Sequence, residues 1–153
     1  MTQVNRLLSV PFVLLWISLA MIPTFVTLYQ RAAPASFWLT VNTVHVFDTV
    51  VGTSPKMEVD RTVIQPFKAD WVAEVEEYDE TVGVFSVRCT GKGTNSYTPT
   101  DQIPADVDLN WWTWPTKCEL QKGKWRVQTL WTIQPPGYPS KEVRITSNTF
   151  EVM

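Results

Sequence analysis

The first long pattern in the chain is an unbroken apolar run from Leu7 to Tyr29, in which no side chain carries a charge. Arg6 and Arg31 bracket the run. At about 1.5 Å per residue, a helix of this length measures roughly 35 Å, which is enough to cross a hydrocarbon core of about 30 Å with some tilt. The pattern therefore predicts a transmembrane helix over residues 7–29, embedded in the lipid bilayer.

Two other interpretations of this run stay open. Ala33-Pro34-Ala35 fits the small-residue pattern of a signal-peptide cleavage site, and cleavage there would release a secreted soluble domain that begins near Ser36. A buried core helix would normally show a polar face, whereas this run offers only Ser and Thr. Because the apolar stretch is much longer than a signal core of about 7 to 15 residues, we favour a retained anchor.

The charges beside the run barely decide its orientation, because one arginine flanks each end. The N-terminal tail is short and needs no translocation, and the cysteines of the later chain suit an oxidising compartment. We therefore predict a single-pass signal anchor. Residues 1–6 would form a cytoplasmic tail, residues 30–37 a linker, and residues 38–153 a periplasmic or extracellular domain.

Beyond the anchor, apolar residues recur with a period near two, and turn residues interrupt them about every ten positions, which predicts β-strands. Strands are expected within Thr40–Val51, Met57–Ile64 and Lys141–Val152, and a bulge would explain the change of phase in the first and the last. The clearest inward-facing series are Trp71, Ala73 and Val75; Phe85, Val87 and Cys89; Val107, Leu109 and Trp111; and Trp125, Val127, Thr129, Trp131 and Ile133. The last series is the longest and predicts a central core strand.

Turn residues separate these strands. The segments 52–55, 91–96 and 134–139 are rich in Gly, Pro, Ser and Asn, and each predicts a turn. About seven short strands in a chain of domain size, with no helical periodicity after the anchor, favour a two-layer β-sandwich. The predicted fold class is thus all-β, an immunoglobulin-like sandwich of about seven strands preceded by one N-terminal transmembrane helix.

One segment resembles immunoglobulin-like domains directly. In Leu120–Val127, Gly123 precedes Trp125 by two positions, which is similar to the turn-and-strand entry where such domains carry a corner tyrosine. Here a tryptophan stands in the tyrosine's place, and no cysteine follows it by two. The resemblance covers this corner and implies architecture alone.

Two cysteines occur, Cys89 and Cys118, and both belong to the domain predicted to lie outside the cytoplasm. A disulfide between them is the favoured interpretation, with two buried free thiols as the alternative. A zinc site is not expected, since His45 is the only histidine and two thiolates leave a tetrahedral shell incomplete.

The aromatic cluster Trp111-Trp112-Trp114 is the main candidate for a contact surface. On a strand, adjacent residues face opposite sides, so an inward Trp111 predicts an outward Trp112. Together with Tyr97 and Tyr138 on other loops, Trp112 and Trp114 could stack on a sugar ring or anchor a protein partner. The favoured interpretation, however, is that Trp112 and Trp114 cover the open edge of the core or lean against the membrane.

Two acidic patterns in the sequence are candidate binding sites, one for a basic partner and one for calcium. The run Glu74, Glu76, Glu77, Asp79 and Glu80 could recruit a basic partner, but a solvated strand edge that discourages aggregation is favoured. The alternating oxygens of Asp106, Asp108 and Asn110 resemble a calcium loop only weakly, because the glycine and glutamate of such a loop are missing. No metal site and no cofactor are predicted.

Charge and motifs limit the function further. The net charge is −2 and basic residues are scattered, so no nucleic-acid partner is expected. There is no Gly-x-Ser-x-Gly elbow and His45 is isolated in the sequence, so no catalytic residue is assigned. We predict a non-enzymatic, membrane-anchored accessory module that contacts a protein partner in the envelope. A carbohydrate or cell-wall binder is the alternative, and a hydrolase with an unrecognised site is a third.

Overall fold

The computed structural model describes residues 4–101, 104–113 and 118–153, and side chains from these ranges except those of residues 4–10 and 111. The chain begins with a long helix, α1 (Val4–Ala32). A short 3-10 helix, η1 (Ala35–Phe37), follows it. The remainder is built mainly from β-strands.

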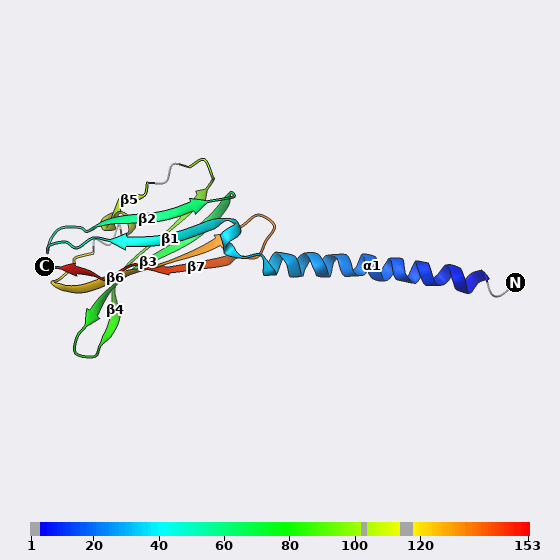
Figure 1. Ribbon diagram of the computed structural model, residues 1–153, viewed down its shortest axis with the longest axis horizontal. Coiled ribbons are helices and arrows are strands. Elements are labelled where there is room, and N and C mark those ends of the chain that lie inside the picture. Colours follow the sequence, from blue (N-terminus) through cyan, green and yellow to red (C-terminus); the bar gives the residue numbers. More distant parts are fainter. Residues whose placement is uncertain (1–3, 102–103, 114–117) are drawn as a thin grey trace. The chain divides into compact units, whose positions relative to one another are not determined.

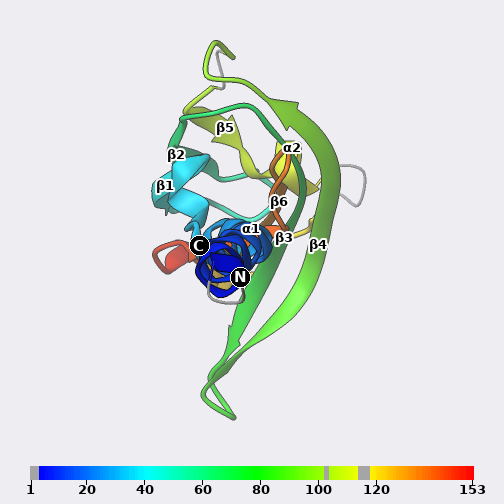
Figure 2. The ribbon, with the colours of Figure 1, turned by 90° about the vertical axis from the view of Figure 1, so that its right-hand side faces the viewer.

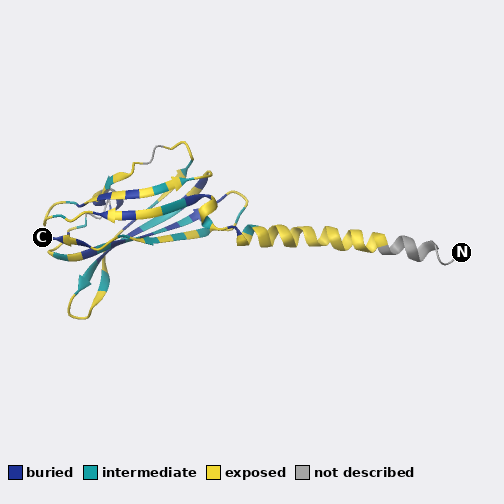
Figure 3. Cartoon of the chain, viewed as in Figure 1, coloured by how far each residue is buried: buried dark blue, intermediate teal, exposed yellow. Residues whose placement is uncertain are grey.

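Helix α1 confirms the prediction of an apolar helix, and its segment Pro11–Ala32 is long and apolar enough to span a membrane. Almost every side chain of that segment is exposed (Figure 3). The polar side chains in the run bond back to the helix: the Ser18 hydroxyl donates to the Leu14 carbonyl at 2.9 Å, and the Thr27 hydroxyl donates to the Pro23 carbonyl. Such bonds satisfy hydroxyl groups where water is absent.

The described β domain contains eight strands in two antiparallel sheets, where about seven strands were expected. One sheet has the order β1-β2-β5, and the other has the order β4-β3-β6-β7 with β8 paired to β6. Figures 1 and 2 show the two sheets as two layers, which is consistent with a β-sandwich. The bounds are β1 Leu39–Val46, β2 Lys56–Val63, β3 Phe67–Asp79, β4 Val84–Tyr97, β5 Asp106–Asp108, α2 Leu109–Thr113, β6 Gly123–Gln134, β7 Lys141–Thr146 and β8 Phe150–Val152.

Strand β6 confirms the strongest sequence prediction. Its five inward residues, from Trp125 to Ile133, are all buried, and they alternate with partly exposed residues. The strand lies between β3 and β7, so it is central in its sheet. Alternation was reliable here because a central strand with one face on the core leaves no freedom of register.

The two predicted changes of phase have different causes. In β1 a register shift between Val41 and Thr43 confirms the predicted bulge. Near the C-terminus the prediction of one bulged strand is wrong, because β7 and β8 are separate strands on either side of Asn148. The Asn148 side-chain amide replaces a strand partner there: it accepts a hydrogen bond from the Val46 N–H at 2.8 Å and donates to the Val46 carbonyl at 2.9 Å.

Strand β4 corrects two predictions. Segment 91–96 was expected to be a turn, but it continues β4 to Tyr97. Phe85 and Val87 were expected to face inward, yet Val87 is 48% exposed and Phe85 is half-buried. A register shift opposite Val75 and Glu76 disturbs the alternation at this point, which the sequence pattern does not reveal.

Two further predictions about strand position are wrong. Residues after Asp108 were expected to continue a strand, but Leu109–Thr113 form the short helix α2. The acidic run was expected on a solvated edge, but β3 lies between β4 and β6, and Glu76 is buried in an ion pair with Arg126. Pairing with a cation satisfies a carboxylate that water no longer reaches.

Candidate functional site

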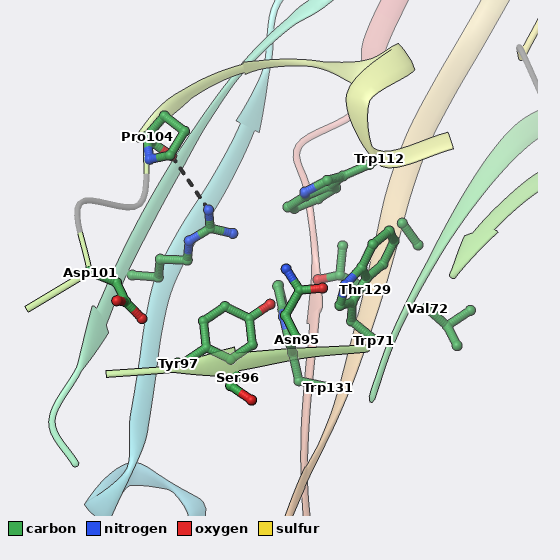
Figure 4. Close-up of a pocket in the computed structure, with 12 residues that line it drawn as sticks. Trp71, Val72, Asn95, Ser96, Tyr97, Asp101, Pro104, Trp112, Thr129 and Trp131 are labelled. Atoms are coloured by element: carbon green, nitrogen blue, oxygen red, sulfur yellow. Dashed lines mark hydrogen bonds between the residues drawn. The ribbon is translucent and has the colours of Figure 1, made fainter. Parts of the chain in front are cut away.

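A cavity of about 230 Å³ lies within the β domain. Its walls come from the inward faces of β2, β3, β4 and β6, from α2, and from the segment that leads into β5 (Figure 4). The cavity is smaller than the roughly 300 to 1,000 Å³ of pockets for drug-sized ligands. Its size therefore suits a small molecule rather than an extended chain.

Two glycines of β4 make room for this arrangement. A Cβ at Gly91 would lie 1.8 Å from the Trp112 carbonyl oxygen, so only glycine lets α2 pack so closely on the strand. A Cβ at Gly93 would lie 2.6 Å from the Trp71 ring. Gly93 is the cross-strand partner of Trp71, and its missing side chain leaves the space that the indole occupies.

Four aromatic side chains belong to the cavity wall: Trp71, Tyr97, Trp112 and Trp131. Trp112 is 3% exposed and meets Trp131 edge-to-face, with ring centroids 6.0 Å apart. Tyr97 stacks on Phe67 at a centroid distance of 5.1 Å. Edge-to-face and offset-stacked arrangements are the favoured geometries of aromatic pairs, so these contacts stabilise the positions of the rings.

Arg61 brings a positive charge to the cavity. It follows Met57 and Val59 on the inward face of β2, so alternation turns its stem toward the core. One terminal nitrogen donates to the Pro104 carbonyl at 3.4 Å, and the buried Nε has no hydrogen-bond partner among the described residues. Loss of solvent lowers the pKa of Arg61, because burial disfavours its charged form, while nearby Tyr97 opposes this.

The same surroundings shift the pKa of Tyr97. Burial raises the pKa of its hydroxyl, and both the Arg61 charge and a hydrogen bond with Trp131 act in the opposite direction. The phenol is therefore neutral at physiological pH and can donate a hydrogen bond. It does not supply an anion for Arg61.

The carboxylate in the cavity wall, Asp101, bonds to the nearby Thr98. It accepts hydrogen bonds from the Thr98 N–H at 2.5 Å and from the Thr98 hydroxyl at 2.9 Å. None of the ion pairs among the described residues includes Arg61. The guanidinium thus faces the cavity without a carboxylate from the described part of the chain.

The sequence-predicted contact residues have different positions. Trp112 and Tyr97 come together in the cavity wall. The prediction that Trp112 faces outward is wrong, because it lies on helix α2 rather than on a strand and packs against Trp131. Tyr138 lies in the loop after β6 and is not part of this wall. Trp114 and the Trp111 side chain lie outside the described residues.

Cys89 and Cys118 form the predicted disulfide, with their Cα atoms 5.7 Å apart. The bond joins β4 to the segment just before β6 and closes a loop of sequence separation 29. That loop carries Asp101, Pro104 and Trp112. The disulfide therefore ties the covering segment of the cavity to the strand that forms its wall.

A second surface is the β3–β4 hairpin, which extends away from the rest of the β domain in Figures 1 and 2. Three of its valines, Val82, Val84 and Val87, are exposed by 66%, 51% and 48%. We call the two at the tip, Val82 and Val84, the hairpin surface, because alternation turns Val87 to the opposite face of β4. Exposed apolar side chains that lie together are a feature of interaction sites.

Local contacts stabilise the hairpin at its tip and along its stem. At its tip, the Asp79 carboxylate accepts a hydrogen bond from the Thr81 N–H at 2.8 Å, and Gly83 adopts a positive φ of 72°. These hydrogen bonds, mainly those with Thr81, lower the pKa of Asp79. Along the stem, Phe85 lies 5.1 Å from the Tyr78 ring and 4.0 Å beneath the Arg126 guanidinium.

The weak calcium pattern has a structural explanation. Asp108 accepts a hydrogen bond from the Asn110 N–H at 2.9 Å, as a residue at the start of a helix does, and another from the Ser54 hydroxyl. Within the described residues, no group of three or more His, Cys, Asp and Glu could hold a metal ion. His45 is exposed, with its ring edge-on to Phe47.

Comparison with family models, with characterised proteins and with solved structures gives no match for this chain. Sequence reasoning missed Arg61, although a signal was present. The alternation of Met57, Val59 and Arg61 places a charged residue on an apolar face, which is a pattern typical of functional sites. The glycines of β4 were a second signal, because glycine inside a strand marks the close approach of another group.

Proposed function

We propose that this protein is a non-enzymatic, membrane-anchored interaction module, whose β domain contacts a protein partner outside the cytoplasm. The observation that carries the proposal is the hairpin surface: two exposed valines, Val82 and Val84, at the tip of a hairpin that extends beyond the rest of the domain. Helix α1 supports the anchor by its length and apolar composition. The disulfide supports an oxidising compartment, because such bonds persist in secreted and periplasmic domains.

The anchor and its orientation have a direct test. We expect the intact protein to remain in the membrane fraction after washing with alkaline carbonate, because the apolar helix is held by lipid. Protease added outside spheroplasts should degrade the β domain. A mature N-terminus near Ser36 would show instead that the helix is a cleaved signal, and a β domain protected from external protease would place it in the cytoplasm.

The hairpin also indicates the chemistry of its partner. Its tip carries Asp79 and Glu80 next to the valines, and the Glu80 side chain is 80% exposed with only a distant contact to Lys124 at 4.0 Å. The basic residue of the stem, Arg88, is already paired with Glu77 at 2.7 Å. The complementary partner surface is an apolar groove with basic residues at its rim.

Photo-crosslinking in native membranes tests this contact. A photoreactive residue at Val84 should give one discrete adduct, and Val82→Asp in the same chain should abolish it, because a charge on the hairpin surface opposes burial. Val51 provides the matched control, since it is a valine 53% exposed in a different loop, the one between β1 and β2.

With the photoreactive residue at Val51, no discrete adduct is expected, and Val51→Asp should leave the Val84 adduct unchanged. Val82 contacts solvent, so its substitution should alter the free energy of unfolding by no more than about 0.5 kcal/mol. Equal adducts at both sites, or an adduct that survives Val82→Asp, would contradict the proposal.

We also propose that the sandwich is immunoglobulin-like. The orders β1-β2-β5 and β4-β3-β6-β7 correspond to strands A-B-E and C′-C-F-G of such domains. In support, the Trp125 indole donates a hydrogen bond to the Gln121 carbonyl at 2.9 Å, the backbone contact that a corner tyrosine makes near the start of strand F. The disulfide departs from the antibody pattern, because Cys89 lies on β4 and Cys118 precedes β6.

The carbohydrate alternative is weaker than the sequence suggested. It depended on an exposed Trp112, and that ring is 3% exposed and packed on Trp131. Stacking on a sugar requires a free aromatic face. We therefore keep the protein-interaction proposal as the leading one.

A further inference from the structure

We propose that the cavity is a binding site for a small organic carboxylate with a flat apolar body. This goes beyond the interaction proposed for the hairpin, because it concerns another part of the domain and a different class of ligand. Three features support it. The Arg61 guanidinium forms no ion pair among the described residues, aromatic rings belong to the wall, and the volume is small, about 230 Å³.

The guanidinium determines the charge of the ligand. Arg61 presents a fork of N–H donors, and the described contacts are one long hydrogen bond to the Pro104 carbonyl and none at the buried Nε. A buried cation is stable when an anion pairs with it, and a carboxylate fits the guanidinium fork with two parallel hydrogen bonds. Asp101 does not fill this role, since none of the ion pairs among the described residues joins it to Arg61.

The aromatic walls determine the shape of the rest of the ligand. Trp71 comes from β3, Trp112 from α2 and Tyr97 from β4, and all three rings line the cavity (Figure 4). Planar rings favour a flat apolar group placed edge-on or stacked between them. The wall is also partly polar, because the exposed residues Asn95 and Ser96 belong to it.

Calorimetric titration of the full chain in a non-ionic detergent tests the proposal, with benzoate as the probe and benzamide as its uncharged isostere. We expect benzoate to bind and benzamide to bind at least tenfold more weakly. Acetate, which lacks the flat body, should also bind at least tenfold more weakly than benzoate. Equal binding of benzoate and benzamide would overturn the role of the charge, and equal binding of benzoate and acetate would overturn the role of the ring.

Two variants locate the site. Arg61→Met should weaken benzoate binding by about 10- to 100-fold, the usual loss for hydrogen bonds to a charged group. The control Arg144→Met removes an exposed arginine of β7 and should change nothing. Asn95→Trp substitutes an exposed position of the cavity wall, so the fold should persist while the bulky ring fills the site.

Near-ultraviolet circular dichroism identifies any variant that has lost its tertiary packing. If Arg61→Met unfolds, the folded Asn95→Trp variant still decides the question. Absence of benzoate binding to the native chain would overturn the proposal. So would undiminished binding in Asn95→Trp, or an equal loss in Arg61→Met and Arg144→Met.

Discussion

Replacing Trp125 by Ala is expected to lower the free energy of unfolding by about 3 to 5 kcal/mol. The side chain is 1% exposed at the start of the central strand β6, and alanine would leave a cavity that the surrounding strands cannot fill. The indole N–H also bonds to the Gln121 carbonyl, so the substitution removes a polar contact together with the packing. Urea unfolding of the full chain in detergent, followed by near-ultraviolet circular dichroism, measures the change.

A more conservative variant separates the two contributions. Trp125→Phe keeps an aromatic ring and loses the hydrogen bond, so its cost should be smaller and should include about 0.5 to 1.5 kcal/mol for that bond. Val84→Ala is the surface control, because Val84 is 51% exposed, and it should change stability by less than about 0.5 kcal/mol. A loss below about 1 kcal/mol in Trp125→Ala would mean that the corner does not stabilise the domain.

The parts of the fold that could be predicted from the sequence are those where one local rule acts alone. Strand β6 follows strict alternation because its inward face is buried along its whole length. The apolar helix was predictable because length and composition decide it. The disulfide was predictable because the chain offers one pair of cysteines.

The errors occur where tertiary packing changes the meaning of a residue. Gly91 and Gly93 look like turn residues in the sequence, but they lie within β4, where their missing side chains admit the α2 backbone and the Trp71 ring. Trp112 appeared to alternate with Trp111 on a strand, whereas helix α2 turns it into the core. Neither contact is local, so a pattern of neighbouring residues could not reveal it.

The candidate site illustrates the same limit. Two of its wall residues, Trp112 and Tyr97, were singled out from the sequence, although for an exposed surface. Arg61 was missed because a single charge in a strand pattern is usually assigned to the solvated face. Only the spatial neighbourhood shows that Arg61 shares a cavity wall with aromatic rings and that Asp101 bonds to Thr98.

Replacing both Cys89 and Cys118 by Ala should lower the free energy of unfolding by about 3.5 kcal/mol on the chain-entropy model. The bond closes a loop of sequence separation 29, and without it the unfolded chain regains the freedom of that loop. Stability of a typical domain is about 5 to 15 kcal/mol, so the loss is a large share of the total. Urea midpoints of the double variant and the native chain, measured in the same detergent, give the difference.

Reduction offers an independent control on the same bond. Native chain treated with dithiothreitol should unfold at the midpoint of the double variant, and the double variant should not respond to the reductant. Before reduction, both thiols should resist alkylation. If two free thiols react in the native chain, the disulfide is not formed in the cell, and the support it gives to an oxidising compartment is lost. If the bond is present but its removal leaves the midpoint unchanged, the segment over the cavity is held by Trp112 and Gly91 packing rather than by the covalent link.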